Sequence, residues 1–441
     1  MNISTDNTTF NHGLEFAAAE KIREGQSVLL ARHIRYLQDK SAFYREEFRE
    51  AGIGPDSFSG LDDLSRFPLT TKEDLGQHAE KFLCVDHSEI VDFCLTSGTT
   101  GKPTPLMQTR SDLERLGYNE ELSFVSAGIT SNDRVLIAAA IDRCFMAGLA
   151  YFLGLVRTGA AAIRAGSGSL PVLEDLVRTY RPTAMVGVPT LMLALGRRLK
   201  NAGDEPSSFG LSRLVCIGEP VREQDFSLSP LGQRLEELWG GRVFSTYAST
   251  EMATTFCECG ERKGGHLHPD LIVTEILDDQ GLPVQPGRPG EVVVTPVGVR
   301  GMPLLRFRTG DIAVMHAETC LCGRSSPRLG PVLGRQSQML KIKGTTVFPN
   351  AIFSALQEMP QVENYYLEVR NRYSLSDEIR VVAGVRDQGL SPLVVAESIA
   401  SRTRVKPEVE LEDPDTVRTR TMVQGKRKPV VFFDYRDDSD E

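Results

Sequence analysis

Short runs of β-branched and apolar residues alternate with helical segments between residues 90 and 335, and this alternation constrains the fold more than any other feature. The clearest runs lie at 134–137, 184–188 and 213–217. Strands that are apolar along their whole length suit a sheet that helices cover on both faces. We therefore predict an α/β fold with helix-flanked β-sheets in a large N-terminal domain.

The rest of the pattern predicts two domains. Residues 15–49 have helical spacing, residues 70–75 look like a capped helix start, and residues 273–297 alternate like antiparallel strands broken by turns. After residue 335 a smaller α+β unit follows, and we place the boundary near Ser337. The predicted domains are 1–336 and a small mobile domain at 337–441. In the small domain we expect strands near 339–342, 362–369 and 379–385, and helices at 351–357 and 393–401.

The bulk composition excludes several classes of protein. The formal charge is −9, which argues against a surface that coats nucleic acid. Residues 1–6 lack the basic and apolar regions of a signal peptide. The most apolar run, at 135–155, contains Asp142 and Arg143 and is therefore not a membrane span. We expect a cytoplasmic protein with neither a nucleic-acid nor a membrane partner.

The segment from Leu95 to Pro105 places hydroxyl side chains, glycines and a lysine in close succession. Backbone N–H groups and hydroxyls in such a loop can surround phosphate oxygens, and the lysine adds positive charge. It is not a Walker A loop, because only two residues separate Gly98 from Gly101 and a proline follows the lysine. The predicted phosphate-binding residues are Thr96, Ser97, Gly98, Thr99, Thr100, Gly101 and Lys102.

This loop resembles the phosphate loop of the adenylate-forming superfamily, which includes acyl-CoA synthetases, nonribosomal peptide adenylation domains and luciferases. Residues 247–252 are similar to its aromatic-x-x-Thr-Glu motif, and residues 305–311 to its aromatic-Arg-Thr-Gly-Asp motif. Residues 334–344 resemble its hinge motif, and 425–428 its terminal lysine motif. The motifs follow the family's order, so the resemblance extends over most of the chain.

The resemblance implies a role for each motif. Glu251 helps to hold Mg²⁺, and Asp311 accepts hydrogen bonds from two ribose hydroxyls, as a carboxylate can. Lys426 neutralises charge that develops between the acid and the α-phosphate, with Lys428 as the competing candidate. The implied catalytic residues are Thr250, Glu251 and Lys426, and the further nucleotide-binding residues are Gly218, Glu219, Pro220, Tyr247, Ala248, Ser249, Asp311 and Arg335.

Within the superfamily, the chain is most similar to the phenylacetate–CoA ligases. Residues 43–53 and 69–75 resemble their N-terminal part, and residues 217–220 stand in the place of their adenine loop. Their glycine-rich aromatic stretch is replaced here by residues 141–148, which should border the acyl pocket. Phenylacetate is therefore not assigned as the substrate. The candidate pocket residues are Phe145, Met146, Gly148, Gly187 and Pro189.

Four of the eight cysteines stand in two close pairs, at 257 and 259 and at 320 and 322. They are similar to metal-binding residues of the phenylacetate–CoA ligases. The resemblance implies that Cys259, His266, Cys320 and Cys322 form a closed Cys₃His site for structural Zn²⁺. Cys257 and His268 compete for two of these positions, and reduced thiols without a metal are the alternative.

The resemblance as a whole implies an ATP-dependent, AMP-forming ligase. It activates an aryl or acyl carboxylic acid as an acyl adenylate and passes the acyl group to coenzyme A. The small domain rotates about a hinge at Ser337 or Gln338 between the two steps. One alternative is a stand-alone adenylating enzyme that loads a carrier protein. Another is a non-catalytic nucleotide-binding regulatory protein, and a homodimer is the default assembly.

Overall fold

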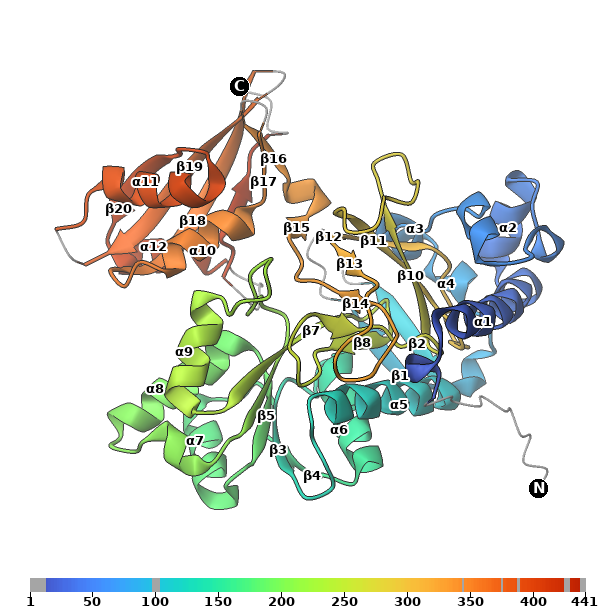
Figure 1. The fold of residues 1–441 in the computed structure, drawn as a ribbon, viewed down its shortest axis with the longest axis horizontal. Helices are drawn as coiled ribbons and strands as arrows, with labels where there is room; N and C mark the ends of the chain where they lie inside the picture. The colour runs from blue at the N-terminus through green and yellow to red at the C-terminus, as the bar shows by residue number, and fades with distance from the viewer. Residues whose placement is uncertain are drawn as a thin grey trace. The chain divides into compact units, whose positions relative to one another are not determined.

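The computed structural model describes residues 13–96, 104–342, 345–373, 376–386, 389–423 and 429–436 (Figure 1). The chain forms two compact units, Met1–Thr309 with Ala313–Pro331, and Gly310–Ile312 with Val332–Glu441. The functional division into domains at 336 and 337 stays a prediction. The predicted α/β class is confirmed, because helices and several sheets alternate along the chain.

A six-stranded sheet forms the centre of the first unit, in the order β4-β3-β5-β6-β7-β8. Neighbouring strands from β4 to β7 run parallel, and β8 runs antiparallel to β7. The three apolar runs of the sequence form β3, β5 and β6, as predicted. The strands are β3 (Arg134–Ala138), β4 (Ala161–Arg164), β5 (Ala184–Gly187), β6 (Arg213–Cys216), β7 (Arg242–Ser249) and β8 (Thr254–Cys257).

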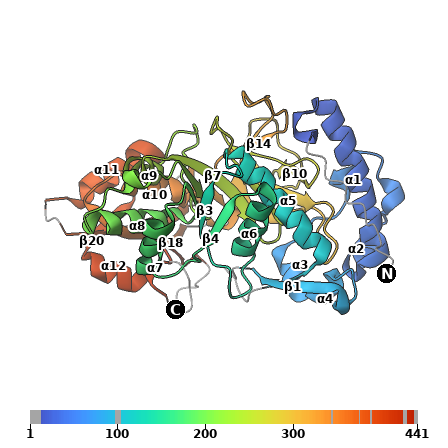
Figure 2. The same cartoon turned by 90° about the horizontal axis from the view of Figure 1, so that it is seen from below.

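Helices cover both faces of this sheet. Alternate residues of a strand point to opposite faces, so Leu136 of β3 packs with α7, α8 and α9, while Val135 packs with α5 and α6. Helices α5 and α6 lie side by side (Figure 2), and a Cβ atom at Gly154 would collide with Glu120. The helices are α5 (Arg110–Ser126), α6 (Met146–Thr158), α7 (Leu170–Tyr180), α8 (Pro189–Asn201) and α9 (Pro230–Trp239).

The N-terminal part of the first unit is helical, with one correction to the sequence interpretation. The helical spacing at 15–49 forms two helices, because Ser41 adopts an extended conformation and caps the second through its hydroxyl oxygen. The capped start at 70–75 is confirmed, since Thr71 and Asp74 form a reciprocal capping box. The helices are α1 (Ala19–Lys40), α2 (Ala42–Glu50), α3 (Lys72–Gln77) and α4 (Ala79–Phe82).

Smaller antiparallel sheets complete the first unit. Strands β10 and β11 pair antiparallel within the predicted range, and β1 pairs antiparallel with β2 on either side of the phosphate-loop segment. Within the described residues, none of the helices combines the length and apolar character that crossing a bilayer requires. The strands are β1 (Ile90–Leu95), β2 (Pro105–Thr109), β9 (Gly265–His266), β10 (Ile272–Leu277), β11 (Gly290–Pro296), β13 (Met315–His316), β14 (Arg328–Leu329) and β12 (Phe307–Ala313), whose residues Gly310–Ile312 belong to the second unit.

The second unit has its own core around a four-stranded sheet in the order β20-β19-β18-β21. The strands and helices predicted after residue 335 are all present, and β15 pairs with Asp311 and Ile312 of β12. The elements are β15 (Gly334–Arg335), β16 (Leu340–Ile342), β17 (Thr345–Val347), α10 (Pro349–Gln357), β18 (Val362–Tyr373), β19 (Ser376–Val385), α11 (Pro392–Thr403), β20 (Glu408–Glu412), α12 (Pro414–Thr421) and β21 (Phe432–Asp434).

Candidate active site and metal centre

The predicted acyl-pocket residues and the nucleotide motifs at 218–220 and 247–251 gather at the carboxyl edge of the six-stranded sheet. Ala138, Gly187, Cys216 and Ser245 are aligned across β3, β5, β6 and β7. The segments that follow these strands carry Phe145 to Gly148 at the start of α6, Pro189 at the start of α8, and the loop residues 218–220 and 250–251. Open α/β sheets bind ligands at this edge, so the topology brings together segments that are far apart in the sequence.

Hydrogen bonds join two of these segments. Thr190, near the start of α8, donates from its backbone N–H (3.0 Å) and its hydroxyl (2.9 Å) to the carboxylate of Glu219. Gly187 lies so close to β3 that an added Cβ would be 2.9 Å from the carbonyl oxygen of Ala138. Gly218 has a φ of 69°, a conformation that favours glycine. The predicted pocket residues Gly187 and Pro189 therefore adjoin the predicted adenine loop.

The aromatic-x-x-Thr-Glu motif spans the end of β7 and the turn into β8. Tyr247, Ala248 and Ser249 belong to β7, and residues 250–253 form the turn. Ala253 has a φ of 45°, and its carbonyl accepts a hydrogen bond of 2.5 Å from Nη1 of Arg115. Arg115 is fully buried on α5 and also donates to the carbonyls of Val297 and Leu271. No sequence pattern indicated this buried arginine behind the turn.

Glu251 faces a small pocket. Its side chain is 8% exposed, and its carboxylate lies 3.3 Å from Nζ of Lys72 at the start of α3. The capped helix start was predicted, but its contact with Glu251 was not. The pocket is lined by Leu106, Met107, Gln108, Asp112, Arg115, Met146, Thr250, Glu251, Ala253, Val299 and Met302.

Part of the predicted phosphate site lies outside the described residues. Thr96 is buried, and its hydroxyl oxygen accepts a hydrogen bond of 3.0 Å from the backbone N–H of Thr104. Leu95 pairs with Pro105, so β1 and β2 hold both ends of the loop. Ser97, Gly98, Thr99, Thr100, Gly101 and Lys102 lie outside the description, as do Lys426 and Lys428.

Asp311 and Arg335, the remaining predicted nucleotide residues, belong to the second unit. They are paired positions of β12 and β15, and the carboxylate of Asp311 lies 3.3 Å from Nε of Arg335. Asp311 is mostly buried, with 15% of its side chain exposed. The candidate hinge residues Ser337 and Gln338 follow in a short 3₁₀ helix, and the carbonyl oxygen of Ser337 accepts a hydrogen bond from Arg436.

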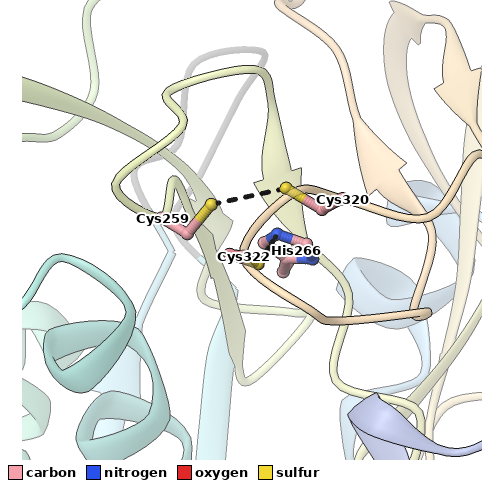
Figure 3. Close-up of side chains that lie close together, drawn as sticks. All are labelled: Cys259, His266, Cys320 and Cys322. Carbon is pink, nitrogen blue, oxygen red and sulfur yellow. Dashed lines mark hydrogen bonds between the residues drawn. The ribbon is translucent and has the colours of Figure 1, made fainter.

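Cys259, His266, Cys320 and Cys322 form a compact cluster in the first unit (Figure 3). One ligand atom from each residue lies within 4.8 Å of the others. The two sulfurs of Cys259 and Cys320 are 3.7 Å apart, and the Cys322 sulfur is 3.4 Å from Nε2 of His266. The structure thus brings together the four predicted residues. Cys257 lies in the core of the sheet instead, packed among residues of α5 and α6.

His268, the other competitor, is buried against Glu15. The carboxylate of Glu15 contacts Nδ1 of His268 and accepts a hydrogen bond of 2.6 Å from Nε of Arg324. The N–H groups of Ser325 and Ser326 donate to the carbonyl oxygen of Glu15. Arg324 also contacts the Cys322 sulfur at 3.6 Å. A segment near the N-terminus is therefore fastened to the loop that carries two of the cluster's sulfurs, a contact that the sequence did not predict.

The surroundings favour the metal-binding protonation states of His266 and Cys322, whereas burial raises the pKa of the Cys259 thiol. Burial lowers the pKa of His266 to about 4, and the positive charge of Arg324 acts in the same direction. The imidazole is therefore neutral at neutral pH, as a metal ligand must be. Burial opposes ionisation of Cys322, but hydrogen bonds from Arg324, Cys320 and Cys259 together outweigh it and lower the pKa of this thiol.

Comparisons with known proteins agree with the motifs. The family model of AMP-binding enzymes matches residues 17–300. The chain is 31% identical to the phenylacetate-coenzyme A ligase of Thermus thermophilus over 85% of its own length and 84% of that protein. It is 26% identical to the Escherichia coli enzyme of the same name, over 86% of each chain.

A solved structure of 2-hydroxyisobutyryl-CoA ligase in the postadenylation state has the same fold, with a TM-score of 0.84 and 24% identity over 96% of this chain and 91% of that one. With the family model matching well over half of the chain, the resemblance predicted from the motifs is confirmed. The chain belongs to the family of AMP-binding enzymes, and its similarity to the phenylacetate–CoA ligases extends over most of its length.

Proposed function

We propose that the protein is an AMP-forming acid–CoA ligase. In the first step, a carboxylate oxygen of the acid attacks the α-phosphorus of ATP, and the bond to the bridging oxygen breaks to release pyrophosphate. In the second, the thiolate sulfur of coenzyme A attacks the acyl carbon, and AMP leaves as the thioester forms. The observation that carries the proposal is the turn with Thr250 and Glu251, which presents a buried carboxylate to a pocket at the edge of an AMP-binding enzyme's sheet.

Catalysis of such a phosphoryl reaction rests on positioning and charge neutralisation. Glu251 would offer an oxygen to Mg²⁺, which neutralises phosphate charge when it is bound, and Thr250 would contact phosphate. Residues 96–102 would surround the phosphates with N–H and O–H donors. Lys426 would balance the charge that develops at the α-phosphate.

The remaining nucleotide contacts are proposed on the same family pattern. Asp311 would accept from the ribose hydroxyls, and Arg335, 3.3 Å from it, would support that carboxylate. Residues 218–220 and 247–249 would border the adenine. The link between Thr190 and Glu219 supports this, because it holds the adenine loop in one position.

The acid itself is proposed as a class. Phe145, Met146, Gly148, Gly187 and Pro189 would line the acyl pocket at the carboxyl edge of the sheet. Four similar curated proteins are named phenylacetate-coenzyme A ligase, whereas a solved structure of the same fold is named for 2-hydroxyisobutyryl-CoA. An aryl or short acyl carboxylic acid is therefore the proposed substrate.

A structural Zn²⁺ is the proposed occupant of the Cys₃His cluster. A tetrahedral ion with Zn–S bonds of about 2.3 Å holds two sulfurs about 3.8 Å apart. The observed separation of 3.7 Å between Cys259 and Cys320 fits this geometry. With four protein ligands, the site leaves no position for a substrate, so its role would be to fasten loops together.

We place the enzyme in the cytoplasm as a possible homodimer, as the sequence leads us to expect. The first test is pyrophosphate release with MgATP across aryl and short acyl acids, with and without coenzyme A. We expect release that depends on the acid and a thioester only with coenzyme A. Adenylate without thioester would point to a carrier protein as acceptor, and ATP binding without any release would contradict the ligase. Lys426→Ala and Lys428→Ala, compared in the same assay, identify the lysine that acts.

A further inference from the structure

Gln108 occupies a core position of β2. The last four residues of this strand are buried, and the Gln108 side chain is among them, at 6% exposed. Apolar residues normally fill such a position, because burying an amide removes its hydrogen bonds to water. A glutamine there needs partners for both amide atoms or a function that leaves one of them open.

The two amide atoms of Gln108 are satisfied unequally. Nε2 points to the sulfur of Met146 at 3.8 Å, while Oε1 is buried and has no hydrogen-bond partner within the described part of the chain. The reverse amide orientation would place the oxygen against the thioether, which can accept but not donate. The hydrogen bonding therefore favours the orientation with an open acceptor, and buried acceptors in folded proteins rarely stay open.

The open oxygen belongs to the pocket of Thr250 and Glu251, since Gln108 is one of its lining residues. Two other polar side chains of the lining, Asp112 and Arg115, are already engaged in hydrogen bonds. Asp112 accepts from the N–H groups of Arg300 and Gly301, and the guanidinium of Arg115 donates to backbone carbonyls. The apolar wall includes Met107, Met146 and Met302. Thioether side chains adapt their shape easily, so a ligand can make room beside the amide.

We propose that Gln108 is a ligand-binding residue whose Oε1 accepts a hydrogen bond from an O–H group of the ligand in this pocket. The proposal rests on the proposed function and deepens it. A carbonyl oxygen cannot pair with a carboxylate or an ionised phosphate oxygen, because all of them are acceptors. The O–H group comes either from a hydroxyl on the acid or from a water molecule bound to the Mg²⁺ that Glu251 would hold.

The test compares the wild type with Gln108→Met, which keeps the length of the side chain and removes the amide. Gln233→Met, at an exposed position on α9, is the matched control. The acids are 2-hydroxyisobutyrate with isobutyrate, and 4-hydroxyphenylacetate with phenylacetate. Pyrophosphate release gives kcat/KM for each acid and the Mg²⁺ concentration at half-maximal rate, and calorimetry measures binding of each acid and of Mg²⁺.

Because Oε1 is open, Gln108→Met should unfold at the same temperature as the wild type or higher. If the donor is the acid's hydroxyl, kcat/KM for one hydroxy acid falls at least about tenfold while its deoxy partner is unaffected. If the donor is the bound water, the half-maximal Mg²⁺ concentration rises severalfold for all acids alike.

Unchanged acid preference together with unchanged Mg²⁺ dependence would overturn the proposal. So would a marked loss of stability, since it would mean that Oε1 has a partner in the folded chain. The calorimetric measurements separate this proposal from the proposed function. A wild type that binds a hydroxy acid or Mg²⁺ through Gln108 but releases no pyrophosphate would refute the ligase and keep the inference. Equal binding by both proteins would refute the inference alone.

Discussion

The Cys₃His cluster and the pocket of Glu251 both lie in the first unit, yet they satisfy their polar groups in opposite ways. In the cluster, four ligand atoms lie within 4.8 Å of one another, and Arg324 and Glu15 surround them with further contacts. In the pocket, Oε1 of Gln108 is buried without a partner among the described residues, and Lys72 reaches Glu251 at 3.3 Å. In the cluster the sulfur and imidazole ligand atoms face one another, whereas in the pocket the amide oxygen of Gln108 is left for a ligand.

This difference separates stability from activity. A closed four-ligand zinc site, as proposed for the cluster, would leave no position for a substrate and would act by holding segments of the chain together. A reactive site accelerates the chemical step only through interactions that are stronger in the transition state than with the bound substrate. Damage to the cluster should therefore appear first in unfolding, and damage to the pocket first in kinetics. Strand β8 runs from the turn that carries Glu251 toward Cys259 of the cluster. A change beside this strand can therefore be tested for its effects on stability and on kinetics.

The largest effect should follow loss of the proposed zinc. We expect Cys320→Ser, or removal of zinc by a strong chelator, to lower the free energy of unfolding by about 5 kcal/mol or more, because metal binding is coupled to folding. Metal content by atomic spectroscopy and thermal unfolding check this. Cys84→Ser, at a buried cysteine outside the cluster, is the control. A Cys320→Ser variant as stable as the wild type would contradict a structural role for the cluster.

Glu251→Gln should show the opposite pattern. Loss of the proposed Mg²⁺-binding carboxylate should lower kcat/KM for adenylate formation by about 10²- to 10³-fold. Stability should change little, because the only described ion pair lost is the one with the partly exposed Lys72. Stopped-flow pyrophosphate detection measures the rate, with the exposed Glu73→Gln as control. If Glu251→Gln is less stable than the wild type but has an unchanged kcat/KM, the contrast drawn between the cluster and the pocket is wrong for the pocket.

The ionisation of Glu120, which contacts strand β8 between the two regions, should make the free energy of unfolding depend on pH. Glu120 on α5 accepts a hydrogen bond of 2.6 Å from Thr255 of β8, and burial raises its pKa to about 7 from an ordinary value of 4.5. The folded chain thus binds this proton more tightly than the unfolded chain, so the contribution of Glu120 to stability falls as the pH rises from about 4.5 through 7.

Glu120→Gln keeps the acceptor and removes the ionisation. Relative to the wild type, its free energy of unfolding should increase between pH 5 and pH 8 by up to about 3 kcal/mol. Urea unfolding across this range measures the difference, and Glu114→Gln, exposed on the same helix, should give a flat difference. A flat profile for Glu120→Gln as well would mean that this carboxyl titrates normally.

The smallest effect concerns the contacts around the cluster. Glu15→Gln removes the charge that binds Arg324 and His268, and we expect zinc affinity to fall about 10- to 100-fold, as for other groups that orient metal ligands. Competition with a chromophoric chelator measures the affinity. Glu20→Gln, exposed on α1, is the control. Equal affinities would show that the N-terminal contact does not act on the metal site.

Local sequence patterns were sufficient for much of the fold. The apolar runs that form β3, β5 and β6 can be recognised in the sequence, because strands covered on both faces must be apolar throughout. The break at Ser41 was not predicted, because a serine fits the periodic helical pattern but here caps the next helix. Motif order was enough to identify the family, since glycines, hydroxyls and carboxylates that contact a nucleotide must recur at fixed spacings.

The resemblance favoured Cys259 over Cys257, and the tertiary structure shows the physical difference between these two residues of similar local appearance. Cys257 and Cys259 are two positions apart, but the first ends β8 in the sheet core and the second lies past the strand, beside the pairing of Glu258 with Gly265. The open oxygen of Gln108 depends on where Met146 lies, thirty-eight residues away. The sequence by itself determined which elements and which chemistry the chain carries. Which atoms meet, and which stay without a partner, was decided by long-range packing, because such contacts join segments whose spacing no local pattern records.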